Sequence, residues 1–201
     1  MKKYGMIHLS YVCAIVSVKL WSILNYVWCR LWGVKIQGGC KFRGLTRFRV
    51  FPEATLAIGK RCEFLSGETS NLMGLQTPCM LSTLTKEAEI VIGNDCGFSG
   101  TVVAAALSIR IGNNVRCGAN TLITDTDWHT DDPRTSPNAP VCIHNNVWLG
   151  YNVKVLKGVT IGENSLIGAC SVVTKNIPAN VIAAGNPCRV IRAISPEFFD
   201  K

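Results

Sequence analysis

One histidine of this 201-residue chain stands between two aspartates in a polar segment rich in proline, threonine and serine. Neutral imidazole is well suited to take a proton from a hydroxyl or an amine near neutral pH, so His129 is a candidate general base. Asp127 and Asp131 flank it, and three roles stay open for each carboxylate: orienting the imidazole, binding a polar substrate, or capping a turn. A histidine in a loop can also be simply solvated, so the surrounding elements must distinguish a catalytic histidine from a solvated one.

The composition and charge exclude some classes of protein. With 48% hydrophobic and 17% charged residues and a net charge of +8, the chain is expected to fold into a packed domain. Basic residues concentrate between Lys35 and Arg61 and again near Arg189, but few aromatic residues lie among them, which disfavours a nucleic-acid partner. A phosphate-bearing cofactor or an anionic membrane surface explains the charge equally well.

The cysteines and histidines do not form a metal-binding pattern. The ten cysteines include no CxxC pair, and several of them fall inside the repeats described next. They are expected to be small buried thiols in a reducing compartment, and we expect no metal site.

Six-residue repeats fill the C-terminal half of the chain. An aliphatic residue recurs every sixth position and is followed, four positions later, by a small or β-branched residue; the aliphatic positions are Ile143, Leu149, Val155, Ile161, Ile167 and Val173. Earlier runs start at Ile92 and Ile58. A period of six indicates one flat side of a triangular coil, with eighteen residues to a turn. The predicted fold class is mainly β, a left-handed parallel β-helix with an N-terminal apolar helix, in preference to a β-sandwich.

The repeats stop between Asp125 and Cys142, where three prolines and several Asp, Thr and Ser predict a loop that leaves the β-helix wall. His129 lies in this segment. Because loops on rigid scaffolds commonly carry chemistry, 125–142 is the expected active-site loop.

The first 35 residues have a different character. They are strongly apolar from Met6 to Val34, and on a helix His8, Lys19 and Arg30 would share one narrow stripe. Such a helix could lie in a membrane interface, or it could pack on the rest of the protein or on sister subunits. A signal peptide and a membrane span are both disfavoured, the latter because Lys19 interrupts the apolar run.

Five motifs resemble the hexapeptide-repeat sugar O-acetyltransferases, a family that includes galactoside and maltose acetyltransferases and the enzymes that acetylate capsule, O-antigen and exopolysaccharide sugars. The motifs are FSGT at 98–101, DTDWHTDDP at 125–133, NVWLG at 146–150, LKGVTIG at 156–162 and GACSVVTKNIPANVIAAGNPCRVIR at 168–192. The resemblance covers about half of the chain. It implies an acetyl-CoA-dependent enzyme with His129 as general base, acting in homotrimers whose active sites lie between subunits.

The resemblance also implies roles for other residues. Ser99 stands where related enzymes place an asparagine or a serine near the acceptor sugar, and we expect Asp127 and Trp128 to contact the acceptor too. The expected contacts of coenzyme A are Trp148, Gly150, Ala169, Thr174, Lys175, Arg189 and Arg192. A groove along stacked coils with basic residues at its end would suit the thin amide-bearing arm and the phosphates of that cofactor.

The function expected from these observations is transfer of an acetyl group from acetyl-CoA to a hydroxyl, or an amine, of a saccharide. The apolar N-terminus favours a lipid-linked acceptor in surface polysaccharide biosynthesis, at the inner face of a bacterial cytoplasmic membrane. The alternatives are an antibiotic acetyltransferase and a non-catalytic β-helix scaffold. A γ-type carbonic anhydrase would need three converging histidines, and His8 lies in the apolar N-terminus.

The expected organisation has four parts. Residues 1–35 form an apolar helix that either associates with a membrane or packs on the trimer, and 36–85 form irregular coils in which hexads are sparse. Residues 86–188 form the acyltransferase β-helix, and 189–201 are a C-terminal tail.

Overall fold

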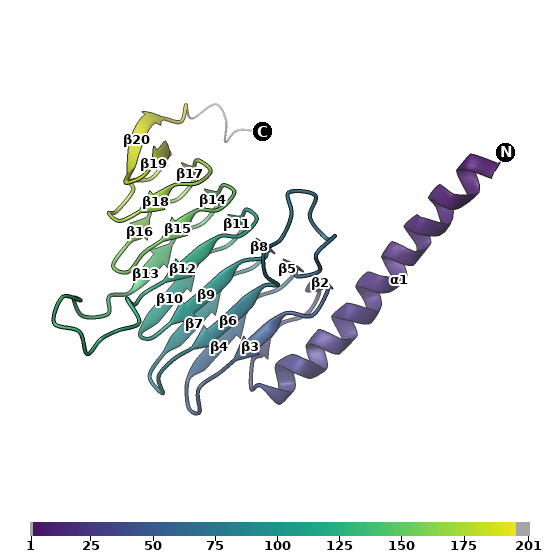
Figure 1. The fold of residues 1–201 in the computed structure, drawn as a ribbon, viewed down its shortest axis with the longest axis horizontal. Coiled ribbons are helices and arrows are strands. Elements are labelled where there is room, and N and C mark those ends of the chain that lie inside the picture. The colour runs from purple at the N-terminus through teal and green to yellow at the C-terminus, as the bar shows by residue number, and fades with distance from the viewer. Residues whose placement is uncertain (1, 196–201) are drawn as a thin grey trace.

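The chain winds into a triangular prism with one long helix at its end (Figure 1). The computed structural model describes residues 2–195, and side chains from residue 15 onward. Helix α1 (Lys2–Leu31) is followed by short strands that fall into three sheets. Sheet A contains β1 (Lys35–Ile36), β4 (Thr55–Ile58), β7 (Glu89–Ile92), β10 (Ser108–Ile111), β13 (Val141–Ile143) and β16 (Thr160–Ile161). Sheet C contains β3 (Arg47–Arg49), β6 (Met80–Thr83), β9 (Val102–Ala105), β12 (Leu122–Thr124), β15 (Lys154–Val155) and β18 (Val172–Val173).

Sheet B is longer and closes the C-terminal end of the prism. It contains β2 (Lys41–Arg43), β5 (Glu63–Leu65), β8 (Gly97–Ser99), β11 (Arg116–Cys117), β14 (Trp148–Leu149), β17 (Leu166–Ile167), β19 (Val181–Gly185) and β20 (Cys188–Ala193). Neighbouring strands are parallel in all three sheets, except that β20 runs antiparallel to β19. Each turn of the chain gives one strand to each sheet, which is the left-handed parallel β-helix that the six-residue period predicts.

The interior is filled by the residues that the repeat places inward. All six leading aliphatic positions of the C-terminal repeats are buried: Ile143, Leu149, Val155, Ile161, Ile167 and Val173. In the N-terminal coils the same positions on sheet B carry Phe42, Phe64 and Phe98, whose rings stack with centroids 5.0 Å apart. Large side chains at equivalent positions stack because parallel strands in register repeat every ~4.8 Å.

Glycine and asparagine form the corners between sheets A and B. A Cβ on Gly93 would lie 2.6 Å from the carbonyl oxygen of Gly112 in the next coil, so only glycine fits there. Beside it, side-chain amides join successive coils: Asn146 donates to Asn164 at 2.9 Å, and Asn164 donates to Asn180 at 2.8 Å. These three asparagines have positive φ, a conformation that asparagine tolerates better than most residues.

Two boundaries differ from the sequence-based expectation. The coils start at Lys35, and the strands β1 to β6 within residues 35–83 are in register with the later coils, interrupted by the loop 66–79. Their inward positions hold phenylalanine and cysteine as well as aliphatic residues, which hid the period. Residues 189–193 of the expected tail belong to the edge strand β20, which pairs with β19.

Helix α1 is fixed to the first coil by hydrogen bonds from its C-terminal half. Ser22 Oγ accepts from the amide of Phe42 at 3.1 Å, and Asn25 Oδ1 accepts from the amide of Thr46 at 2.9 Å. Asn25 and Cys29 are fully buried. Among the described residues, no helix combines the length and the apolar character needed to cross a membrane.

Candidate active site

The loop that carries His129, residues 125–140 (the histidine loop), starts on a buried carboxylate. Asp125 follows β12 directly and is fully buried. Its two oxygens accept hydrogen bonds from the backbone amides of Ala106 (2.7 Å) and Leu107 (2.8 Å). The far end of the loop is tied back as well, since the amide of Ala139 donates to the carbonyl of Asp125 at 3.1 Å. Charged hydrogen bonds are stronger than neutral ones, so the base of the loop is firmly held.

Lys157, which follows strand β15, contacts two residues of the histidine loop. Its side chain is 13% exposed, and its ammonium group lies 2.5 Å from the carboxylate of Asp127 and 2.5 Å from the carbonyl of Ser136. Asp127 is therefore engaged by Lys157 and holds the loop to the β-helix. Asp127 therefore helps to hold the loop in position. Its predicted contact with the acceptor stays a prediction.

His129 is held through its backbone, and its side chain is exposed. Its amide donates to the carbonyl of Asp127 at 2.9 Å, and its carbonyl accepts from Thr135 Oγ1 at 3.0 Å. Trp128, 56% exposed, has a φ of +70°, an uncommon conformation for a bulky residue. A fixed backbone with a free imidazole suits a base that must reach a substrate.

The other carboxylates of the loop act locally. Asp132 binds the guanidinium group of Arg134 at 2.6 Å, and this partner holds the pKa of the Asp132 carboxyl below its usual range. Asp131 is exposed. Among the described hydrogen bonds, none joins a loop carboxylate to the imidazole of His129.

Ser99 ends strand β8, at the corner where sheet B meets sheet C. It is 8% exposed and lines a groove of about 370 Å³. Charged residues surround this groove: Arg61 and Asp95 form a bidentate ion pair at 2.6 Å, and Glu63 and Arg116 complete the lining. The guanidinium group of Arg61 lowers the pKa of the Asp95 carboxyl. A polar, charged groove of this size could bind a hydroxyl-rich molecule.

Ser99 and His129 lie far apart within one chain. Ser99 precedes sheet C, and the histidine loop leaves sheet C at its other end. Strand β9, which spans this sheet, has four residues and is therefore about 13 Å long. A single chain does not bring the predicted base and the predicted acceptor residue together.

Several of the predicted coenzyme A contacts share one row across sheet B. Trp148 pairs with Leu166, Leu166 with Ile182, and Ile182 with Arg192 in successive strands. Trp148 is 51% exposed, and Arg192 is exposed three strands away, about 14 Å at the usual strand spacing. Arg189 lies on the same edge strand and is also exposed.

The remaining predicted contacts divide between two corners. Gly150 and Ala169 meet at the corner between sheets B and C, where a Cβ on Gly150 would lie 2.8 Å from the amide nitrogen of Ala169. Close stacking of coils therefore explains Gly150. Thr174 and Lys175 are exposed just after β18, at the corner from which the histidine loop projects.

Sequence reasoning did not single out Asp125 or Lys157. The position of Asp125 at the point where the hexads stop was an available signal, because a carboxylate there can accept free amides of the broken coil. Lys157 lies thirty residues from Asp127, and only the coil register brings the two together.

Comparisons with known proteins match part of the coils to a family. Residues 143–175 match the family described as "Bacterial transferase hexapeptide (six repeats)". The galactoside O-acetyltransferase of Escherichia coli (strain K12) is 47% identical over 93 residues, which are 44% of this chain and 45% of that protein. The galactoside O-acetyltransferase of Lactococcus lactis is 49% identical over 130 residues, 62% of each chain. The chain thus matches between about half and three fifths of the length of these relatives.

Solved structures agree on the fold. AntD, an N-acyltransferase from Bacillus cereus, was solved in complex with dTDP and 3-hydroxybutyryl-CoA. That structure superposes on this chain with a TM-score of 0.65 and 16% sequence identity, over 87% of this chain and 91% of that one. A mutant of AntD, in complex with dTDP-4-amino-4,6-dideoxyglucose and coenzyme A, gives a TM-score of 0.64 over 87% of this chain and 92% of that one. Residues 143–175 therefore match transferase hexapeptide repeats, and the whole array of coils has the left-handed β-helix fold that the resemblance implied. Two relatives that are similar in sequence are named galactoside O-acetyltransferases, and the predicted resemblance is confirmed.

Proposed function

We propose that this protein transfers an acetyl group from acetyl-CoA to a hydroxyl of a saccharide, with His129 as general base. The observation that carries the proposal is the braced histidine loop on transferase hexapeptide repeats: Asp125 and Lys157 fix the backbone, and the imidazole of His129 is left free. A scaffold protein would gain nothing from such a loop, which speaks against the non-catalytic alternative.

The chemistry needs one proton transfer at the protein. Acetyl-CoA supplies the acetyl group as a thioester. His129 takes the proton of the acceptor hydroxyl as its oxygen bonds to the acetyl carbon, and the protonated imidazole then returns that proton to the leaving thiolate. Ser99, on the acceptor side, is positioned in the proposal to hold the sugar or to donate a hydrogen bond to the developing oxyanion.

The row from Trp148 to Arg192 supports a coenzyme A site along sheet B. The indole offers an apolar wall to the pantetheine arm, and Arg192 and Arg189 offer cations to the phosphates. Thr174 and Lys175 lie at a different corner of the same chain, so in the proposal they reach a cofactor bound against a neighbouring subunit.

The separation of Ser99 from His129 supports a homotrimer. If the acceptor groove of one subunit faces the histidine loop of the next, the two half-sites combine at each of three interfaces. A cyclic trimer closes such head-to-tail contacts without leaving an unpaired half-site.

The acceptor we propose is a lipid-linked saccharide used in surface polysaccharide biosynthesis, at the inner face of a bacterial cytoplasmic membrane. The exposed aliphatic residues of α1 and the polar groove around Ser99 support it. An amine acceptor on a nucleotide sugar is the second candidate, since AntD, which has the same fold, is an N-acyltransferase. A soluble antibiotic would have no use for an apolar helix.

The test is thiol release from acetyl-CoA, measured with a panel of nucleotide sugars, lipid-linked oligosaccharides and aminoglycosides. We expect His129→Ala to lower kcat by about a hundredfold or more on the accepted substrate. His144→Ala is the matched control, because His144 is exposed on the next coil and takes no part in the proposed site. A His129→Ala protein as active as wild type would refute the mechanism, and turnover only with aminoglycosides would refute the saccharide acceptor.

A further inference from the structure

Helix α1 presents an unpartnered aliphatic stripe to its surroundings. Five side chains share this stripe and are each about half exposed or more: Val16 (58%), Leu20 (56%), Ile23 (63%), Val27 (54%) and Leu31 (73%). At 3.6 residues per turn they fall within a sector of about 80°. Ser22, Asn25 and Cys29, which contact the first coil, lie on the opposite side of the helix. The stripe therefore faces away from the β-helix.

The positive charge of the whole chain is concentrated around this helix. Residues 1–52 contain nine of the 21 lysines and arginines and none of the 13 aspartates and glutamates. The remaining residues carry twelve basic against thirteen acidic groups, so they have a net charge of −1. All of the excess charge thus lies on α1 and the first coil.

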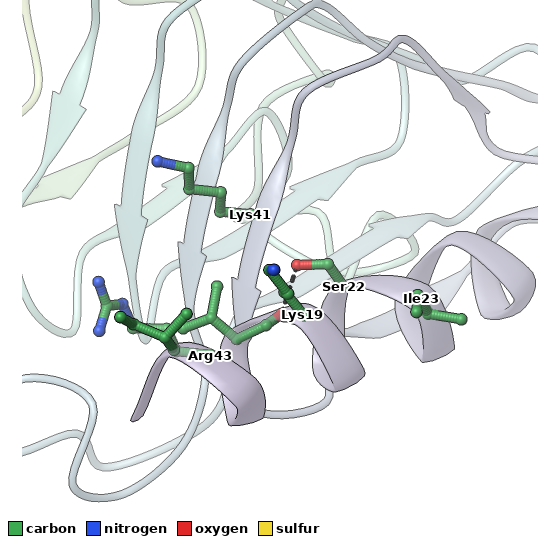
Figure 2. A pocket seen from close by; sticks show the side chains of 7 residues that line it. Lys19, Ser22, Ile23, Lys41 and Arg43 are labelled. Atoms are coloured by element: carbon green, nitrogen blue, oxygen red, sulfur yellow. Dashed lines mark hydrogen bonds between the residues drawn. The ribbon is translucent and has the colours of Figure 1, made fainter. Parts of the chain in front are cut away.

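Basic side chains border the stripe and line the cleft beside it. Lys19 and Arg30 are exposed along one edge of the stripe, about 40° to 60° around the helix from Val16. Between α1 and strand β2 lies a cleft of about 610 Å³, with aliphatic walls from Ile15, Val18 and Ile23. Figure 2 shows Lys19, Ser22 and Ile23 on the helix and Lys41 and Arg43 on the strand beside it.

We infer that α1 and the first coil dock on the surface of an anionic phospholipid bilayer. The aliphatic stripe enters the interface, and the cations of Lys19, Arg30 and Lys41 meet the lipid phosphates. The cleft between α1 and β2 takes one lipid, with its phosphate near Lys41 and the upper part of an acyl chain against Ile23. A second copy of this chain is the less suitable partner, because two such surfaces would bring together basic groups with no acidic group in residues 1–52 to offset them.

The inference is tested by co-sedimentation of the full-length protein with vesicles. One set contains phosphatidylcholine alone, and the other contains phosphatidylcholine with phosphatidylglycerol. We expect binding to the anionic vesicles that weakens strongly at high salt, since salt screens exposed charges. Equal binding to both vesicle types, or none to either, overturns the inference.

Two pairs of variants separate the stripe from the charge. Leu20→Glu with Val27→Glu is expected to lower the partition coefficient by about tenfold or more, whereas Leu72→Glu with Ile191→Glu, also highly exposed, leaves it unchanged. Lys41→Glu is expected to lower it about fivefold to tenfold, and Lys60→Glu, exposed on the second coil, much less. Circular dichroism confirms that each variant is folded.

Sedimentation velocity without lipid tests the competing occupant. If Leu20→Glu with Val27→Glu reduces the oligomeric state and leaves vesicle binding intact, the stripe is a contact between copies and the inference fails. An unchanged oligomeric state with lost vesicle binding supports it.

Discussion

The histidine loop (125–140) and the loop between β5 and β6 (66–79, the second loop) leave the prism on opposite sides in Figure 1. The histidine loop is tied down by a buried carboxylate and an ammonium group, Asp125 and Lys157. The second loop is held by a neutral amide, because Asn120 accepts from the amide of Gln76 at 2.8 Å and donates to the carbonyl of Gly74 at 3.1 Å. Because charged hydrogen bonds are stronger than neutral ones, we expect the histidine loop to be the more rigid of the two.

Of the variants that test this difference between the two loops, Asp125→Ala is expected to have the largest effect on stability and activity. The variant leaves the amides of Ala106 and Leu107 without an acceptor in a buried place, which should lower the free energy of unfolding by about 3 kcal/mol. Thiol-release activity should fall by more than tenfold, because a displaced base loses its alignment. Urea denaturation and steady-state kinetics measure the two effects. Asp125→Asn keeps one acceptor oxygen, so its stability and activity should lie between those of the wild type and Asp125→Ala. An alanine variant as stable as the wild type would show that the carboxylate of Asp125 does not hold the base of the loop.

A smaller effect is expected from Lys157→Met, which keeps the length of the side chain and removes its charge. Loss of the contacts with Asp127 and Ser136 should lower kcat severalfold with little change in the KM of acetyl-CoA. Lys154→Met is the control, since Lys154 lies on β15, three residues before Lys157, and contacts Asn120 and Asn152 instead. Equal losses in both variants would remove any special role for Lys157.

Asn120→Ala tests the second loop. It should lower the free energy of unfolding by about 1–2 kcal/mol and speed proteolytic cleavage within 66–79. Because Ser99 lies at this corner, the KM of the acceptor should rise while the KM of acetyl-CoA stays constant. A matching loss of kcat without a change in the acceptor KM would contradict the division between the two loops.

The smallest effect concerns Asp132 and Arg134, an exposed pair inside the histidine loop. Because Arg134 lowers the pKa of Asp132, the stability that the pair provides is present above the usual carboxyl range and is lost as the pH falls through the lowered pKa. Asp132→Asn should therefore lower Tm slightly at pH 7 and leave it unchanged in strong acid. Thermal scans across that range measure it, and a Tm difference that persists in acid would assign the effect to packing.

The sequence predicted the C-terminal coils well and the rest less completely. From Ile143 onward the leading position of each hexad is aliphatic without interruption, so the period is visible and the burial follows. In residues 35–83 the interior uses Phe42, Cys62 and Phe64, and the second loop breaks the phase, so regular coils looked irregular. Strand β20 was hidden because antiparallel pairing at an edge leaves no hexad pattern.

The sequence predicted which kind of residue acts at the candidate site, but it did not predict how the supporting residues are arranged. His129 and its loop follow from the break in the repeats and from the family resemblance. The brace formed by Asp125 and Lys157 does not, since it depends on which residues of adjacent coils come into register. The roles of Ser99 and of the coenzyme A contacts remain predictions.

The corner asparagines have a consequence for the dimensions of the molecule. Their side-chain amides bond to the equivalent asparagines of the neighbouring coils, so the same contact repeats with every turn of the prism. The histidine loop leaves the fourth coil. That coil lies three strand spacings, or about 14 Å, from the first coil, to which α1 is hydrogen-bonded. The number of coils between them therefore sets the distance from α1 to the histidine loop along the prism, in steps of about 4.8 Å.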